Sequence, residues 1–238
     1  MALKIGIIGP PNSGKSYSRT FIEKGEEVFV IAPSHKMTHI TTSNGEPIKQ
    51  LVKDDKGNYV SGNWTLCPSL DKLPLILDFV QKLPHIKVVI LPDFTHFISK
   101  IIADPNFIKR KAGGEAFQRF WELAGDTLNN FILSLDYLRE DLIIITEYHS
   151  EYDESLDSFK IFVPGGKMLE EKFKLDSYYD FMLYTHTEQK ESGEIENYYF
   201  VTKKWKKYNA RFANLFEDVL IPNNLQLVLD TFRKASGI

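Results

Sequence analysis

Short apolar runs recur along the chain and are separated by segments whose apolar residues fall at helical spacing. Apolar runs without polar alternation are typical of strands that are buried on both faces of a parallel sheet. They predict strands at residues 3–8, 26–32, 86–91, 141–146 and 179–185. The segments between them predict helices at residues 16–24, 69–83, 96–103, 115–139 and 167–175. Strands that alternate with helices in this way indicate an α/β fold with a mainly parallel sheet.

Two stretches depart from this alternation. Residues 197–204 follow the turn signal Ser192-Gly193 and return beside the preceding strand, so we expect an antiparallel hairpin at one edge of the sheet. Residues 41–63 are polar and rich in turn signals, which predicts a small hairpin inserted between core elements. We therefore expect a single domain over residues 1–238, with this hairpin insertion at about 41–63.

The bulk composition limits which kinds of protein this chain can be. Of the 238 residues, 43% are hydrophobic and 26% are charged, as in ordinary globular proteins. A formal net charge of −3 means that any nucleic-acid binding must come from local basic patches. The single cysteine, Cys67, excludes an internal disulfide and favours a reducing, intracellular setting. No apolar run is long enough to cross a bilayer and no signal peptide precedes the first strand. We expect a cytoplasmic protein, in the host cell cytoplasm if it is viral.

The first strand leads directly into the residues G-P-P-N-S-G-K-S, which match the Walker A pattern G-x-x-x-x-G-K-[ST] at every position. The two glycines of this pattern let backbone N–H groups turn toward one centre and surround a phosphate. Lys15 brings a charge to the β- and γ-phosphate oxygens, and the Ser16 hydroxyl can hold Mg²⁺. The alternative is a Gly/Pro turn with a solvated lysine. The pattern predicts an ATP site formed by Gly9, Pro10, Pro11, Asn12, Ser13, Gly14, Lys15, Ser16 and Tyr17.

A second carboxylate signal follows the apolar run at residues 86–91. Asp93 lies directly after this predicted strand, where a carboxylate can complete the Mg²⁺ site beside the phosphate loop. The alternative is an Asp that caps the following helix. We interpret Asp93, together with Ser16, as a metal-binding residue.

These motifs, and the order of elements after them, give the chain a resemblance to the RecA-like P-loop ATPases, most closely to their compact single-domain bacteriophage versions. The features that carry it are the phosphate loop, Asp93, a helix that follows Gly165-Gly166 and feeds a strand, and a late strand that ends in Thr202-Lys203-Lys204. The resemblance implies a three-layer αβα fold, and ATP and Mg²⁺ as ligands. It also implies a sensor strand at 142–146 that ends beside the γ-phosphate, with Lys15 and His149 in catalytic roles.

Two features differ from the family pattern. Relatives often place a catalytic glutamate at the end of the second or third strand, where it polarises the attacking water. Residues 31–36 at the end of the second strand contain no carboxylate, so Glu147 is the candidate replacement, and Asp71 is a weaker one. Slow hydrolysis is consistent with this difference. The loop that corresponds to the second DNA-binding element is also acidic, which repels phosphate backbones.

Two basic clusters are candidates for single-stranded DNA. The first consists of Lys109, Arg110 and Lys111, and the second places Lys203, Lys204, Lys206, Lys207 and Arg211 around two aromatic residues, Trp205 and Tyr208. Basic side chains interleaved with aromatic rings suit a single strand, because charges follow phosphates and rings accept stacked bases. The alternative is a solvated edge strand that uses lysines against edge pairing. Lys206 or Arg211 could also complete the site of a neighbouring copy in a homo-oligomer.

The sequence thus predicts an ATP-binding and ATP-hydrolysing RecA-like protein that acts on single-stranded DNA in phage recombination or replication. Two alternatives stay open, a small-molecule P-loop kinase and a nucleotide-dependent binding protein with negligible hydrolysis. A GTPase is disfavoured because the chain contains no Asn-Lys-x-Asp base-reading motif. His35 and His39 stand four residues apart without a further ligand, and we interpret them as surface residues.

Overall fold

The computed structural model describes residues 2–34, 42–45, 47–104, 115–170, 175–212 and 214–237, except for the side chains of 115–119, 167 and 168. Within these residues one eight-stranded sheet has the strand order β14-β11-β10-β1-β7-β6-β2-β5. Its strands are β1 (Leu3–Ile8), β2 (Val28–Ala32), β5 (Trp64–Leu66), β6 (Val88–Leu91), β7 (Ile143–Tyr148), β10 (Phe181–Gln189), β11 (Ile195–Val201) and β14 (Leu220–Pro222).

Six neighbouring strands of this sheet run parallel: β10, β1, β7, β6, β2 and β5. Strand β11 pairs antiparallel with both β10 and β14. This arrangement confirms the predicted α/β class, the mainly parallel sheet and its antiparallel edge. Strand β1 lies between β7 and β10, and its last residue, Ile8, stands opposite Tyr148 and Tyr184. The carboxyl ends of these three strands therefore meet at one edge of the sheet.

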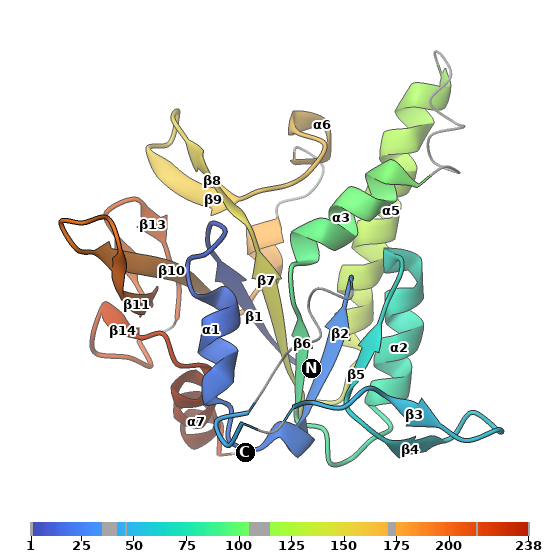
Figure 1. Cartoon of the computed structure of the whole chain (residues 1–238). Coiled ribbons are helices and arrows are strands. Elements are labelled where there is room, and N and C mark those ends of the chain that lie inside the picture. The colour runs from blue at the N-terminus through green and yellow to red at the C-terminus, as the bar shows by residue number, and fades with distance from the viewer. Residues whose placement is uncertain are drawn as a thin grey trace.

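Helices cover both faces of the sheet (Figure 1). On one face, α2 (Leu73–Val80), α3 (Phe94–Ala103) and α5 (Glu115–Asp136) share a core with Val89 and Leu91 of β6. On the other face, α7 (Leu225–Ser236) shares a core with Val88 and Ile90 of the same strand. Successive residues of a strand point to opposite faces, so a run of four apolar residues serves both cores. The layers are thus helix, sheet and helix.

Several elements differ from the sequence prediction. The helix expected at 16–24 is a single turn, α1 (Lys15–Ser18), followed by the 3-10 turn η1 (Arg19–Phe21). The strand expected at 197–204 ends at Val201. The helix expected at 167–175 is divided into α6 (Lys167–Glu170) and the 3-10 turn η6 (Leu175–Tyr178), separated by residues that the structure does not describe.

Small two-stranded sheets lie outside the main sheet. Strands β3 (Val52–Lys53) and β4 (Tyr59–Ser61) form one of them, within the stretch 41–63. The acidic segment after β7 is a hairpin of β8 (Ser150–Asp153) and β9 (Ser158–Ile161), where the sequence predicted a connection without strands. A third pair, β12 (Lys204–Trp205) and β13 (Tyr208–Asn209), carries most of the second basic cluster. In the described part of the chain, no helix is long and apolar enough to span a membrane.

Candidate nucleotide-binding site

The segment Gly9–Ser16 connects β1 to α1 at the carboxyl edge of the sheet. The Gly9 N–H donates a hydrogen bond of 3.1 Å to the carbonyl of Tyr148, which fixes the start of the loop on β7. In the strand order, β2 lies to one side of β1 and β10 lies to the other, so the chain reverses its direction across the sheet at β1. Open α/β sheets bind their ligands at such a reversal of strand order, outside the carboxyl ends of the strands.

The two glycines of the loop are required by its geometry. A Cβ atom on Gly9 would overlap the Oγ1 atom of Thr185 and would lie 2.6 Å from Ser13 Oγ. Gly14 has a φ of +98°, which disfavours any side chain, and a Cβ there would lie 2.7 Å from the ring of Tyr198. The loop is therefore packed closely against β10 and β11, in the shape of a cradle that only glycine permits at these two positions.

Lys15 is buried beneath this loop, with a relative exposure of 8%. Its Nζ donates hydrogen bonds to the carbonyls of Gly9 and Pro10, at 2.5 and 2.7 Å. Burial lowers the pKa of Lys15 to about 8, although the carboxylates of Glu147 and Asp93 act in the opposite direction. The ammonium group is still mostly protonated at neutral pH. Lys15 thus offers a charged donor at the centre of the loop.

Glu147, the fifth residue of β7, forms a buried ion pair that the sequence did not predict. Its Oε1 lies 3.2 Å from Nε of Arg19, and the two side chains are 2% and 3% exposed. The same guanidinium donates from Nη2 to the Ser16 hydroxyl at 2.7 Å. Arg19 therefore joins the candidate metal-binding hydroxyl to the candidate catalytic carboxylate.

Asp93 lies between β6 and α3 with a φ of +48°, an unusual conformation for a residue other than glycine. Its Oδ1 lies 3.3 Å from Nε2 of His149, and the backbone N–H of His149 donates to Thr95 Oγ1 at 2.9 Å. Burial alone raises the pKa of Asp93, but the neighbouring imidazoles of His149 and His96 bring it below its ordinary value. Asp93 is therefore a carboxylate at neutral pH, in contact with the predicted sensor histidine.

A pocket of about 490 Å³ brings these groups together. Its lining contains most of the predicted ATP-site residues and all of the predicted metal-binding and catalytic residues: Pro11, Asn12, Ser13, Gly14, Lys15, Ser16, Tyr17, Asp93, Glu147 and His149, joined by Tyr198. Gly9 and Pro10 contribute through the carbonyls that hold Lys15. Tyr198, which the sequence did not single out, packs on Tyr17 with ring centroids 5.1 Å apart.

Fewer of the predicted nucleic-acid residues can be placed. Lys109, Arg110 and Lys111 lie outside the described residues, as do His35 and His39. In the β12–β13 hairpin, the rings of Trp205 and Tyr208 stack nearly parallel, with an interplanar angle of 8° and centroids 6.0 Å apart, and Lys206 Nζ lies 4.0 Å from the Trp205 ring centroid. Lys203 and Lys207 bond within the chain, to the Glu217 carbonyl and the Asp157 carboxylate. Lys204 and Lys206 are exposed.

Arg211 is one of two residues that the sequence suggests for completing the site of a neighbouring copy. Its Nη2 donates to the carbonyls of Asp176 and Tyr179, at 2.9 and 2.8 Å. The guanidinium thus holds the start of β10 in its own chain. These contacts give Arg211 a role within the subunit.

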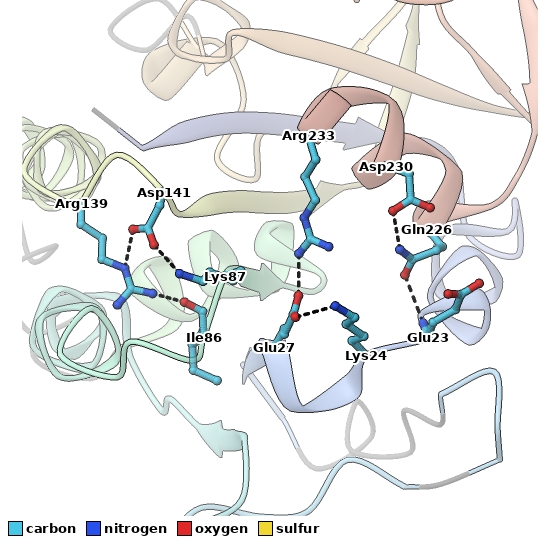
Figure 2. Close-up of polar contacts among 10 residues, drawn as sticks. All are labelled: Glu23, Lys24, Glu27, Ile86, Lys87, Arg139, Asp141, Gln226, Asp230 and Arg233. Carbon is cyan, nitrogen blue, oxygen red and sulfur yellow. Dashed lines mark hydrogen bonds and ion pairs between the residues drawn. The ribbon is translucent and has the colours of Figure 1, made fainter. Parts of the chain in front are cut away.

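A larger hollow, of about 560 Å³, lies at the opposite end of the sheet, near the amino ends of the strands. Figure 2 shows several charged groups at this end of the sheet, and two carboxylates among them pair with basic residues. Arg233 and Lys24 both bind Glu27, while Lys87 and Arg139 both bind Asp141. These contacts join α7 and the end of α5 to the strands, and we assign them a structural role.

The donor set at the candidate site fits a magnesium nucleotide better than a metal held by protein alone. No group of three or more His, Cys, Asp or Glu residues that could hold a metal ion occurs in the part of the chain that the structure describes. Mg²⁺ in nucleotide sites needs only one or two protein oxygens, because phosphates and water supply the rest. No protein-family model matches the chain, and no curated protein matches it significantly. The function must therefore be inferred from the site.

Proposed function

We propose that the protein is a RecA-like P-loop ATPase that binds ATP with Mg²⁺ and hydrolyses it slowly. The observation that carries this proposal is the single pocket shared by the phosphate loop, Asp93, Glu147 and His149. A phosphate loop alone would support nucleotide binding only. Two carboxylates and a histidine beside it are the groups that metal binding and water activation require.

The loop would bind the triphosphate through its backbone N–H groups and through Lys15. The ammonium group now donates to the Gly9 and Pro10 carbonyls, so phosphate oxygens would replace weaker acceptors with charged ones. The Ser16 hydroxyl and the Asp93 carboxylate would hold Mg²⁺. The metal ion supplies positive charge that stabilises the developing charge on the phosphate oxygens.

Glu147 is the candidate general base for the attacking water. Its Oε1 is engaged by Arg19 Nε at 3.2 Å, so the carboxylate is not free to turn toward an attacking water. Hydrolysis through this carboxylate is therefore expected to be slow. His149, in contact with Asp93, is the candidate that responds when the γ-phosphate leaves.

A second proposed function, single-stranded DNA binding, is supported by the β12–β13 hairpin. Trp205 is partly exposed, and the exposed Lys204 and Lys206 flank it. Base stacking on an aromatic ring and phosphate attraction to nearby lysines act together in proteins that bind single strands. The hairpin is joined to β9 by stacking of Phe159 on Tyr208, with ring centroids 5.2 Å apart. Because β9 belongs to the hairpin that follows His149, DNA and nucleotide would bind to connected elements.

The nucleotide site is tested by Lys15→Ala, with Lys24→Ala as the matched control. Lys24 is 62% exposed and lies at the other end of the sheet, so its loss should leave nucleotide binding unchanged. Lys15→Ala should weaken equilibrium binding of Mg²⁺-ATP by at least about tenfold, because a hydrogen bond between charged groups contributes roughly 1.5–3 kcal/mol. Circular dichroism should show that both variants stay folded. Wild-type affinity in the folded Lys15→Ala variant would refute the site.

A further inference from the structure

Arg19 has an environment that folding stability alone does not explain. It begins the 3-10 turn after α1, three residues beyond Ser16, and its side chain is 3% exposed. A buried arginine is costly unless its charge is paired and its N–H groups are bonded. The charge of Arg19 is paired with Glu147, but not all N–H groups of Arg19 have a hydrogen-bond acceptor among the described residues.

Three atoms of this pair have no hydrogen-bond partner among the described residues: Arg19 Nε, Arg19 Nη1 and Glu147 Oε1. The 3.2 Å approach of Nε to Oε1 is an ion pair without good hydrogen-bond geometry. Buried polar groups in folded proteins are nearly always satisfied, so an exception calls for an explanation. Glu147 and Ser16, the two residues that Arg19 contacts, both line the nucleotide pocket. The explanation therefore lies at the pocket.

The direction of the bond to Ser16 has a chemical consequence. A guanidinium can only donate, so the Ser16 oxygen accepts from Arg19 Nη2 with one lone pair. The hydroxyl keeps one lone pair and its own proton, and Arg19 limits the directions in which they can point. A hydroxyl binds a cation only when a lone pair faces it. Arg19 thus restricts the orientation of the proposed metal ligand.

We propose that Arg19 is a positioning residue that orients the Ser16 hydroxyl for the magnesium ion of the bound nucleotide and holds the Glu147 carboxylate beside it. This inference rests on the proposed function, since it concerns the metal side of the same site. Arg19 contacts no phosphate in this scheme and acts only through its two neighbours. A lysine at this position would keep the charge but lose the planar fork that reaches both of them.

The experiment compares ATP affinity in the presence of Mg²⁺ and in excess EDTA, for the wild type and Arg19→Lys. In EDTA the two proteins should bind ATP equally, because the phosphate cradle and Lys15 are unchanged. The increase in affinity that Mg²⁺ gives should fall by roughly 10- to 100-fold in Arg19→Lys, the usual effect of removing a residue that orients a metal ligand. Arg233→Lys is the matched control, since Arg233 also forms a partly buried ion pair but lies at the opposite end of the sheet. It should behave as the wild type in both solutions.

A second variant keeps the test decisive if Arg19→Lys does not fold. Arg19→Gln combined with Glu147→Gln removes both charges together and leaves two amides of similar shape, and it should show the same selective loss of the Mg²⁺ effect. A folded Arg19 variant with an undiminished Mg²⁺ effect would overturn the inference. So would equal losses with and without Mg²⁺, which indicate a purely structural role. A wild-type protein that binds no ATP in EDTA or in Mg²⁺ would instead overturn the proposed function, and this inference with it.

Discussion

At the scale of single residues, the strongest steric constraint on the site is at Gly9. We predict that Gly9→Ala destabilises the protein by about 1–3 kcal/mol, because the added methyl group overpacks the contact between the loop and β10. The methyl would overlap Thr185 Oγ1 and crowd Ser13 Oγ, so the loop must move away from its cradle shape. Binding of Mg²⁺-ATP should weaken as well. Urea denaturation and equilibrium nucleotide binding measure the two effects.

Gly6→Ala is the matched control for this prediction. Gly6 lies in β1, three residues before Gly9, and a Cβ there would approach the Tyr179 ring at 3.3 Å, a tight contact without overlap. Gly6→Ala should destabilise the protein less than Gly9→Ala does, and it should leave nucleotide binding unchanged. Thr185→Ala removes the overlapping oxygen and should partly rescue Gly9→Ala. Equal effects of the two glycine substitutions, with no rescue, would contradict the steric explanation.

Site residues that form a contiguous motif could be predicted from sequence, whereas the ion pair between residues distant in sequence could not. The phosphate loop is contiguous, and its residue types are fixed by backbone geometry, so the pattern identifies it directly. Glu147 could be proposed because it directly follows the buried strand predicted at 141–146. Its partner Arg19 gave no signal, since a helical arginine is ordinarily a solvated residue. The pairing depends on the register that aligns Glu147 with Ile7 of β1, and register is a property of the folded sheet.

At the scale of elements, the β12–β13 hairpin carries the prediction about nucleic acid. Reversing the charge of both Lys204 and Lys206 to Glu should weaken binding of single-stranded DNA. It should also make the slope of log affinity against log salt shallower by about 1–2, since each lost phosphate contact removes about 0.7 for a single strand. Titration of a labelled oligonucleotide at several salt concentrations measures both quantities.

The control makes the same charge reversal on the β3–β4 hairpin, with Lys53→Glu and Lys56→Glu together. Both of these lysines are exposed and belong to the β3–β4 unit. Non-specific attraction of DNA to the whole protein would respond equally to either pair. Equal responses would therefore remove the assignment of DNA binding to β12–β13, and no DNA binding by the wild type would remove the function itself.

The elements that the sequence predicted are those whose burial is encoded by a continuous apolar run. Strands β1, β2, β6 and β7 are of this kind. The β8–β9 hairpin was missed because its sequence is polar and acidic, and it is stabilised by partners elsewhere, such as Tyr208 on Phe159. The helix after the loop was predicted too long. The chain becomes extended at Ile22, which is 1% exposed and packs in the core beneath α7.

At the scale of the whole molecule, the two ends of the sheet have different roles. The carboxyl end holds the candidate site, whose charged groups are close together and incompletely bonded. The amino end holds the network of Figure 2, in which Glu27 and Asp141 each pair with two basic residues. Arg139, for example, binds Asp141 and the carbonyls of Gln81 and Leu83. The candidate site is thus separated from the groups that hold the layers together.

This separation predicts how a nucleotide changes the stability of the fold. A ligand that binds the native state alone adds about 2.7 kcal/mol when its concentration is 100 times its Kd. Each kcal/mol raises the melting temperature of a chain of this size by about 2–4 °C, so saturating Mg²⁺-ATP should raise it by roughly 5–10 °C.

Thermal denaturation followed by circular dichroism tests this shift, with Lys15→Ala as the control. The variant should show at most about half of this rise, because a tenfold weaker affinity at the same ATP concentration leaves about 1.4 kcal/mol of stabilisation. Substitutions in the amino-end network, such as Arg233→Lys, should lower the melting temperature but keep the nucleotide-dependent rise, since that network lies far from the phosphate loop. A rise that survives in full in Lys15→Ala and is lost in Arg233→Lys would place the nucleotide at the amino-end hollow, and would contradict the assignment of the site to the phosphate loop.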